Sequence, residues 1–196
     1  EQIGDVLVQA GFSTILTDPD LPSGTDRIAA ANETLEAERI INVQADEPLV
    51  TRSQILALAE AIEKTKSDMS TLATPIDCSE DFQDSNVVKV VRDVNGFAMY
   101  FSRAPIPYPR DDFDALEKKA LPLFRHLGIY GYTAEFLRSF TSFPTGDLEQ
   151  IEKLEQLRAL ENGRRIAVVL TDELSIGVDT PEDLKRVAPF LIADGA

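Results

Sequence analysis

Two short apolar runs, far apart in the chain, are each followed by a turn that carries an aspartate. Residues 39–43 lead into Gln-Ala-Asp-Glu-Pro at positions 44–48, and late in the chain a similar pattern ends in Gly-Val-Asp-Thr-Pro at positions 177–181. Each turn precedes apolar residues at helical spacing, and this order of strand, turn and helix is typical of α/β folds. Ligands of open α/β sheets bind at the carboxyl ends of strands. We therefore expect Asp46 and Asp179 to meet across one cleft and to share a metal.

Apolar residues alternate between helical and strand-like spacing along the chain, which predicts one α/β domain over residues 1–196. Helices are expected at 1–10, 23–35, 54–64, 134–140, 148–161 and 181–191. Strands are expected at 12–16, 40–43, 70–76, 87–92, 97–101, 127–132 and 166–170. The alternation predicts a mostly parallel central sheet with helices on both faces. Asn95-Gly96 predicts a hairpin, and hence a small antiparallel ribbon.

A proline-rich excursion interrupts this pattern at about residues 103–124. It contains four prolines and several charged residues. Such a segment is expected on the surface, as a lid or an arm for association, because a buried loop would leave its polar backbone groups unpaired.

Composition limits the classes of partner. A net charge of −15 argues against nucleic-acid binding, which needs clustered Lys and Arg. Because no apolar run approaches the roughly 20 residues of a membrane span, no membrane insertion is expected. The single cysteine, Cys78, cannot form an intrachain disulfide, and no signal-like start is present, which favours the cytoplasm. A small anionic ligand is compatible with this charge if Mg²⁺ is bound, since Mg²⁺ is held by one or two carboxylates plus substrate phosphates.

Six motifs, in the same order, resemble those of the 3-deoxy-manno-octulosonate cytidylyltransferase family, also called CMP-Kdo synthetases. They are residues 23–27 (Ser-Gly-Thr-Asp-Arg), 44–48, 100–107 (Tyr-Phe-Ser-Arg-Ala-Pro-Ile-Pro), 125–132 (Arg-His-Leu-Gly-Ile-Tyr-Gly-Tyr), 154–158 (Leu-Glu-Gln-Leu-Arg) and 177–184. The resemblance covers nearly the whole chain. It implies a Rossmann-like nucleotide-diphospho-sugar transferase fold. It also implies a Mg²⁺-dependent enzyme that transfers CMP from CTP to the anomeric hydroxyl of 3-deoxy-D-manno-octulosonate (Kdo), for lipopolysaccharide biosynthesis. Members of the family form homodimers.

The resemblance also implies roles for particular residues of this chain. It assigns Mg²⁺ and catalysis to Asp46 and Asp179. It assigns the nucleotide to Ser23, Gly24 and Arg27. It assigns the sugar acid to Gln44, Arg103, Arg110, His126, Tyr130, Glu155 and Gln156.

The residues alone leave simpler roles open for several of these positions. Ser23 precedes one expected helix, and Asp179 and Thr180 precede another; Ser, Asp and Thr are common N-caps. His126 is the one histidine, and a lone histidine beside apolar residues is more often structural than catalytic. Glu155 and Gln156 lie on an expected amphipathic helix whose apolar side carries Ile151, Leu154, Leu157 and Leu160, so they would be solvated helix surface.

Three departures from the family pattern bear on activity. Leu21 stands where the family usually has His, and Ala45 replaces the glycine of a Gln-Gly-Asp motif, where a side chain could crowd a ligand or an unusual φ. The family begins with a strand and a basic phosphate loop, and this sequence has no counterpart. Its helical pattern starts at Ile3 with no capping residue before it. We therefore expect the N-terminal strands to be missing, the chain to be truncated or processed, and this piece alone to be inactive.

Three alternatives stay open. A cytidylyltransferase for another sugar acid, of the sialic acid or 8-amino-Kdo type, would share the same motifs. A nicotinamide-dependent oxidoreductase would share the strand and helix alternation, but no Gly-x-Gly-x-x-Gly follows a strand here. A non-catalytic fragment or paralogue would keep only the fold.

Overall fold

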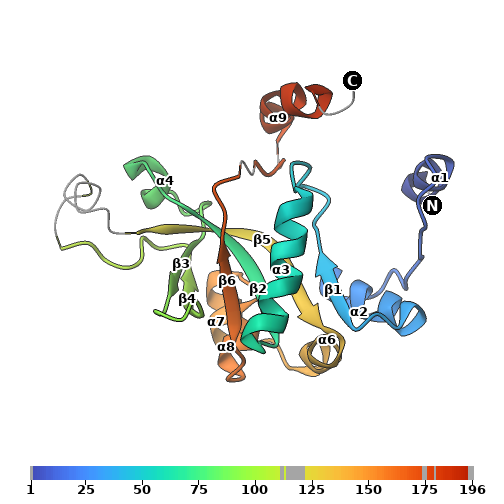
Figure 1. Cartoon of the computed structure of the whole chain (residues 1–196), viewed down its shortest axis with the longest axis horizontal. Coiled ribbons are helices and arrows are strands. Elements are labelled where there is room, and N and C mark those ends of the chain that lie inside the picture. Colours follow the sequence, from blue (N-terminus) through green and yellow to red (C-terminus); the bar gives the residue numbers. More distant parts are fainter. Residues whose placement is uncertain (1, 111–112, 114–121, 174–175, 179, 194–196) are drawn as a thin grey trace.

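A central six-stranded sheet carries helices on both faces in the computed structural model (Figure 1), which describes residues 2–110, 113, 122–173, 176–178 and 180–193. The strands are β1 (Arg39–Asn42), β2 (Met69–Pro75), β3 (Lys89–Arg92), β4 (Ala98–Ser102), β5 (Phe124–Thr133) and β6 (Ile166–Leu170). The helices are α1 (Gln2–Gln9), α2 (Gly24–Leu35), α3 (Arg52–Thr65), α4 (Ser79–Gln83), α6 (Ala134–Ser142), α7 (Asp147–Glu152), α8 (Leu157–Glu161) and α9 (Pro181–Ala193). The expected α/β fold with helices on both faces is confirmed.

The long strand β5 organises the sheet. Its whole length pairs antiparallel with β2, while its other edge pairs with β1 at one end and with β3 at the other. β2 and β6 form a parallel pair. β1, β2 and β6 therefore run in one direction, but β5 separates β1 from β2 and runs against both. The expected mostly parallel pairing is thus wrong, because β5 follows the ribbon and the excursion rather than a crossover helix.

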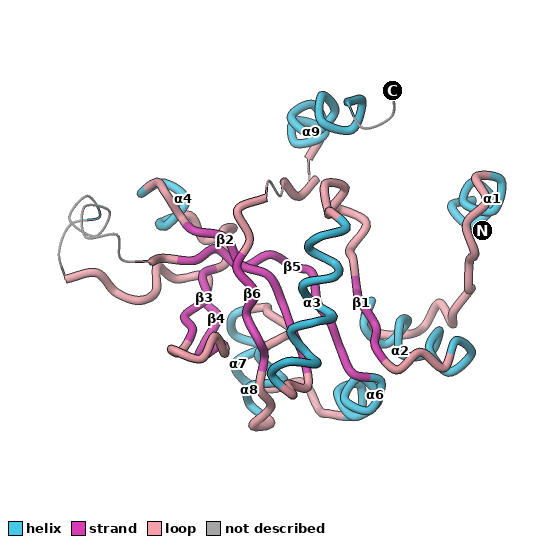
Figure 2. Tube along the Cα trace, viewed as in Figure 1, coloured by secondary structure: helices cyan, strands magenta, loops and turns pink. Residues whose placement is uncertain are grey.

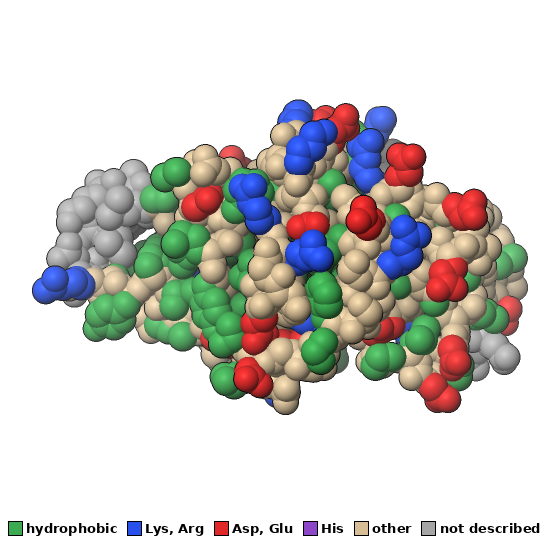
Figure 3. All heavy atoms as spheres, turned by 90° about the horizontal axis from the view of Figure 1, so that it is seen from below, with side chains coloured by type: hydrophobic (Ala, Val, Ile, Leu, Met, Phe, Trp, Pro, Cys, Tyr) green, Lys and Arg blue, Asp and Glu red, His purple; other side chains and the backbone are tan. Residues whose placement is uncertain are grey.

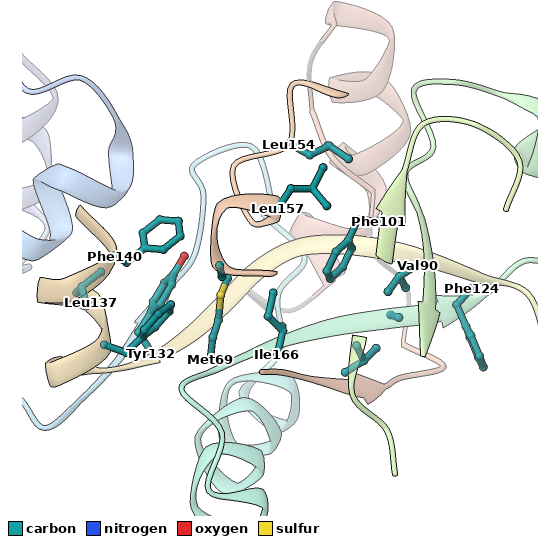
Figure 4. Packing of buried hydrophobic residues seen from close by; sticks show 14 residues of the cluster. Met69, Val90, Phe101, Phe124, Tyr132, Leu137, Phe140, Leu154, Leu157 and Ile166 are labelled. Carbon is teal, nitrogen blue, oxygen red and sulfur yellow. The ribbon is translucent and has the colours of Figure 1, made fainter. Parts of the chain in front are cut away.

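Each face of the sheet buries its own apolar cluster. On one face, Leu58 of α3 packs with Leu72, Leu127 and Ile129. On the other, aromatic and aliphatic side chains of α6 and α8 pack on β2, β5 and β6, and Figure 4 shows Tyr132 beside Leu137 and Phe140. The rings of Tyr132 and Phe140 lie 6.3 Å apart between centroids. These clusters hold β5 rigidly from both sides.

Local capping signals account for the helices that were predicted well. Ser23 caps α2, and Thr51 with Gln54 forms a capping box at the start of α3. The hairpin between β3 and β4 is also confirmed, with Gly96 at a φ of 86° that suits glycine. The short helix α4 was not predicted; it begins after Cys78, whose sulfur accepts a hydrogen bond from the backbone of Asp81 at 3.5 Å.

Two expected elements differ. Residues 12–16 form no strand, and Phe12 and Leu16 are exposed. Figure 2 shows this segment as a loop that runs between α1 and α2, away from the sheet. A strand needs hydrogen bonds from a neighbouring strand, and none of the described strands lies beside this one.

The helix expected at 148–161 is two helices, α7 and α8, because the chain turns at Lys153. Lys153 takes a left-handed φ of 55°, and its N–H donates to Glu149 O at 2.8 Å. The turn leaves Ile151 76% exposed, although it was expected in the core, and brings Gln156 to only 3% exposure. The break therefore decides which side chains of this segment face inward.

Acidic and basic side chains are interspersed over the face shown in Figure 3, with exposed apolar side chains between them. Among the described residues, no helix is both long and apolar enough to cross a membrane. Of the predicted excursion, residues 111–112 and 114–121 lie outside the described part of the chain.

Candidate active site

The loop after β1 meets the loop that leads to α9. The N–H of Val178 donates to the carbonyl oxygen of Asp46 at 2.8 Å. A Cβ added at Gly177 would lie 3.9 Å from that same oxygen. The two aspartate motifs are therefore adjacent, as their positions after strands predicted. Asp179 itself lies outside the described residues, so its side chain is not placed and a metal shared with Asp46 stays a prediction.

The carboxylate of Asp46 is exposed and has no hydrogen-bond partner in the described part of the chain. Those residues contain no group of three or more His, Cys, Asp or Glu side chains placed to hold a metal. Mg²⁺ needs no such cage, because it binds through one or two carboxylates together with phosphate oxygens and water. A free carboxylate at an open strand end fits that coordination. Ala45, next to it, is exposed and has no positive φ, so nothing in the backbone there requires glycine.

The capping role considered for Asp179 falls to its neighbour. The hydroxyl of Thr180 accepts a hydrogen bond from the N–H of Asp183 at 3.2 Å, and the Thr180 N–H donates to Asp183 Oδ2 at 3.1 Å. This reciprocal pair is a capping box for α9. Thr180 is thus the N-cap of α9, and the interpretation of Asp179 as that cap is wrong.

The N-terminus of α2 lies beside the Asp46 loop. Ser23 accepts from the N–H of Asp26 at 3.2 Å and donates to its carboxylate at 2.6 Å, so its hydroxyl is used as a cap. A Cβ at Gly24 would lie 3.9 Å from Gln44 Oε1. The backbone of this first turn is therefore accessible at the same edge as Gln44, and free N–H groups there can bind a ligand.

Arg27 holds the loop that precedes α2. Its guanidinium donates to the Thr17 hydroxyl at 3.2 Å and to the carbonyl oxygens of Asp18 and Pro19 at 2.8 and 3.0 Å. These bonds fix residues 17–21 in front of the helix, and a direct contact of Arg27 with a nucleotide remains a prediction.

His126, Gly128 and Tyr130 lie on one face of β5, because side chains alternate along a strand. The rings of His126 and Tyr130 are 5.5 Å apart between centroids. A Cβ at Gly128, on the same face, would meet no atom within 4 Å. The two rings are therefore in contact with each other, and the position of Gly128 opens to unfilled space.

Glu155 is held from two sides, although it was expected on a solvated surface. Its Oε2 accepts a hydrogen bond from the Thr25 hydroxyl at 2.6 Å, and its Oε1 lies 3.8 Å from the guanidinium of Arg158. Arg158 in turn binds Glu149 through two bonds of 2.7 and 2.6 Å. The interpretation of Glu155 and Gln156 as solvated helix surface is wrong, because the turn at Lys153 points them inward.

Three buried polar atoms have no hydrogen-bond partner among the described residues: Asn42 Nδ2, Glu155 Oε1 and Gln156 Nε2. Buried polar groups are almost always paired, so these atoms are candidates for contact with a ligand or with water. Asn42 was missed in the sequence. It ends β1 directly opposite Tyr130, and its Oδ1 accepts from Gln44 Nε2 at 3.1 Å. A polar residue at the end of an apolar strand, two positions before Gln44, was the available signal.

Arg103 and Arg110 were also expected to bind the sugar acid, but neither is joined to His126 or Tyr130 in the described residues. Arg103 donates from Nε to Glu152 O at 2.8 Å and from a terminal nitrogen to Ser85 O at 3.1 Å, so it ties the end of β4 to α7. Lys89, fully buried, donates to the Arg103 carbonyl at 2.8 Å and supports it. Arg110 is exposed on the excursion.

Burial keeps both ring side chains of the site neutral. It lowers the pKa of His126 to about 3. It also raises the pKa of Tyr130 well above its ordinary value, with further contributions from Tyr132 and Glu155. At neutral pH both residues can therefore donate and accept hydrogen bonds, but His126 is a poor general base.

The histidine has a measurable consequence for stability. Because its folded pKa of about 3 is below its ordinary value of 6.5, the unfolded chain binds the proton more readily as the pH falls. The stabilisation is complete above pH 6.5, and about 2 kcal/mol of unfolding free energy should be lost between pH 8 and 5. Urea unfolding at pH 8 and at pH 5 measures the loss. The variant His126→Gln has no imidazole and should lose less unfolding free energy over that interval. An equal loss in both proteins would contradict the assigned pKa.

A cavity of about 700 Å³ adjoins the N-terminus of α2. It shares Ser23 and Glu155 with the site, and its walls include Phe143, Lys153 and Arg158. Gln44, Asp46, His126 and Tyr130 do not line it. We place the chemistry at the strand ends, where the aspartate loops meet, and not in this cavity.

Comparison with known proteins identifies the family. The cytidylyltransferase family model matches residues 1–166. A 3-deoxy-manno-octulosonate cytidylyltransferase from Syntrophotalea carbinolica is 48% identical over 194 residues, which cover 97% of this chain and 78% of that protein. A protein of the same name from Xanthomonas campestris pv. campestris (strain 8004) is 47% identical, with 90% of this chain and 74% of that protein covered.

A solved structure shares the fold closely. It is a CMP:2-keto-3-deoxy-manno-octonic acid synthetase complexed with CTP, and it matches with a TM-score of 0.88 at 31% identity, covering 98% of this chain and 78% of that one. Sequence, fold and the order of the site motifs lead to one assignment: this chain belongs to the 3-deoxy-manno-octulosonate cytidylyltransferase (CMP-Kdo synthetase) family of nucleotidyltransferases.

Proposed function

We propose that the protein transfers CMP from CTP to the anomeric hydroxyl of Kdo and releases pyrophosphate. The observation that carries this proposal is the hydrogen bond between Val178 N and Asp46 O, which joins the two aspartate loops. It is supported by the names of the relatives and by the CTP in the matched synthetase structure.

Displacement at the α-phosphate depends mainly on in-line positioning and on neutralisation of phosphate charge. Asp46, with Asp179, would hold Mg²⁺, which supplies that neutralisation when it is bound. A triphosphate is compatible with the chain's net charge of −15 when such a cation neutralises part of the phosphate charge. The first turn of α2, at Gly24 and Thr25, offers backbone donors for the nucleotide at the same edge.

The polar cluster on β5 and at the α7–α8 turn suits a sugar acid. Kdo carries several hydroxyl groups, each of which can donate and accept a hydrogen bond. The unpaired atoms include two donors, Asn42 Nδ2 and Gln156 Nε2, and one acceptor, Glu155 Oε1. The Thr25 hydroxyl and Arg158 hold Glu155 in place, so its carboxylate is positioned before the sugar arrives.

Homodimer formation, a cytoplasmic location and Mg²⁺ as the ion remain predictions from the sequence. So does the choice between Kdo and the 8-amino or sialic acid substrates, although the names of the relatives favour Kdo.

The proposal is tested by measuring pyrophosphate released by the full-length gene product. With CTP, Mg²⁺ and Kdo, release should be rapid, and it should fall to background when EDTA is added or the sugar is left out. Parallel reactions with the 8-amino analogue and with a sialic acid test the related substrates. Background release with all three acids would refute the proposal.

Gly128→Ala tests whether the unfilled space at Gly128, on the face of β5 that carries His126 and Tyr130, receives the sugar. The added methyl group would meet no protein atom within 4 Å, so the fold should tolerate it, with a change in unfolding free energy of at most about 1 kcal/mol. It would occupy the volume assigned to the sugar, so we expect the KM for Kdo to rise while the KM for CTP stays the same. Gly163→Ala is the control outside the site, because it also adds a methyl group where no atom lies within 4 Å. The positive φ of Gly163 means that this control should lower the unfolding free energy more than Gly128→Ala does. An unchanged KM for Kdo in Gly128→Ala would place the sugar elsewhere.

A further inference from the structure

A β-bulge interrupts the pairing of β2 with β5, and the hydroxyl of Thr71 is the hydrogen-bond donor to the backbone carbonyl groups of β5 there. Thr71 pairs with Tyr130 and the next residue, Leu72, pairs with Leu127, so Gly128 and Ile129 have no partner on β2. The Thr71 oxygen lies 3.1 Å from the carbonyl oxygen of Leu127 and 2.9 Å from that of Ile129. Thr71 is fully buried, and buried carbonyl groups require a donor. The Thr71 hydroxyl is the donor that the bulge otherwise lacks.

The same hydroxyl contacts His126. The His126 Nε2 atom lies 2.9 Å from the Thr71 oxygen. A threonine has one hydroxyl proton, and a carbonyl oxygen can only accept. If that proton goes to a carbonyl of β5, Nε2 must carry its own hydrogen and donate it to Thr71. The imidazole is neutral because burial lowers its pKa to about 3. Nδ1 therefore has no proton and is an acceptor.

Nδ1 is available to a ligand. It has no hydrogen-bond partner within the described ranges, and it is not among the unpaired polar atoms that are fully enclosed by protein. The edge-on ring of Phe101, 4.9 Å away between centroids, fixes the imidazole from one side. Tyr130 and the unfilled space at Gly128 lie along the same face of β5.

We propose that Thr71 is a positioning residue, which holds His126 in its Nε2–H form so that Nδ1 accepts a hydrogen bond from a hydroxyl group of the sugar acid. This role rests on the proposed function for its ligand. Its specificity consequence is direct: a hydroxyl at this point of the substrate can donate to Nδ1, whereas an ether oxygen or a methylene group cannot.

The first test needs no variant. His126 is the single histidine of the chain, so a ¹⁵N-histidine-labelled, tag-free protein gives the ring nitrogens of one residue. Two-bond ¹H–¹⁵N spectra of the folded protein at pH 7 should show a protonated Nε2 and an unprotonated Nδ1, and addition of Kdo should shift the Nδ1 resonance. A protonated Nδ1, or an Nδ1 resonance that does not respond to saturating Kdo, would overturn the proposal.

The second test compares two substitutions. Thr71→Val removes the hydroxyl at nearly constant volume, and we expect the KM for Kdo to rise about tenfold, the effect of one lost hydrogen bond, with kcat and the KM for CTP within about twofold. Thr71→Ser keeps the hydroxyl and should behave as the wild type. In Thr71→Val the histidine spectrum should also become a mixture of both neutral forms. An unchanged KM for Kdo in folded Thr71→Val would overturn the proposal.

The outcomes separate this proposal from the proposed function. If Thr71→Val does not fold, the wild-type spectra with and without Kdo decide alone. If the wild type releases no pyrophosphate but shows the Nε2–H form and a response of Nδ1 to Kdo, the transfer reaction is refuted and the role of Thr71 stands. If the wild type releases pyrophosphate but Nδ1 is protonated, the transfer reaction stands and the role of Thr71 is refuted.

Discussion

Asp46→Asn in the full-length protein should lower pyrophosphate release by a factor on the order of 10³, the loss seen when one group that stabilises transition-state charge is removed. The substitution keeps the shape of the side chain and removes the negative charge available to a divalent cation. The carboxylate is exposed and unpaired within the described residues, so the free energy of unfolding should change by no more than about 0.5 kcal/mol. Steady-state pyrophosphate assays and urea unfolding measure the two effects.

Asp172→Asn is the matched control, because Asp172 is also an exposed aspartate in a loop that follows a strand, β6. We expect its activity and stability to equal those of the wild type. Asp179→Asn should resemble Asp46→Asn, since Thr180 already caps α9 and the substitution removes no cap. If Asp46→Asn kept more than a tenth of the activity, Asp46 would have no metal or catalytic role.

Arg158→Met should have the largest effect on stability. The guanidinium makes two hydrogen bonds to Glu149 and lies 4.9 Å from the ring centre of Phe140, and both charged side chains are only 11% exposed. Removing one partner of a buried ion pair leaves the other charge buried and alone, which costs about 3–5 kcal/mol. The same change frees Glu155 from its neighbouring cation, so the KM for Kdo should rise as well.

Urea unfolding of Arg158→Met and of Glu149→Gln/Arg158→Met separates charge from packing. The double variant has no unpaired carboxylate, so it should recover part of the lost free energy. Arg138→Met, on the exposed side of α6, is the control and should unfold like the wild type. A loss below about 1 kcal/mol in Arg158→Met would mean that the pair behaves as a surface salt bridge.

Sequence patterns predicted the parts of the fold that depend on neighbouring residues. The cap at Ser23 and the Asn95-Gly96 hairpin are each complete within a few positions. The direction of β5 could not be predicted in this way. It depends on pairing with β1 and β2, which are distant in the sequence, and a strand shows the same alternation in either direction.

Two spatial relations within the candidate site followed from the sequence, but most of its geometry did not. The loops that carry Asp46 and Gly177 do meet, and His126 and Tyr130 share a face of β5. The inward position of Gln156 could not be predicted. The apolar spacing of residues 148–161 is that of one amphipathic helix, and only the left-handed turn at Lys153 divides the segment into two helices. The partners of Thr71 come from a bulge, which has no signature in the sequence of β2.

The most direct test is a crystal structure of the full-length protein with CTP and Mn²⁺, with the ion located by its anomalous scattering. We expect a peak at about 2.1 Å from a carboxylate oxygen of Asp46, in contact with the phosphates and with Asp179. An ion bound with the phosphates but distant from both aspartates would contradict the proposed metal site.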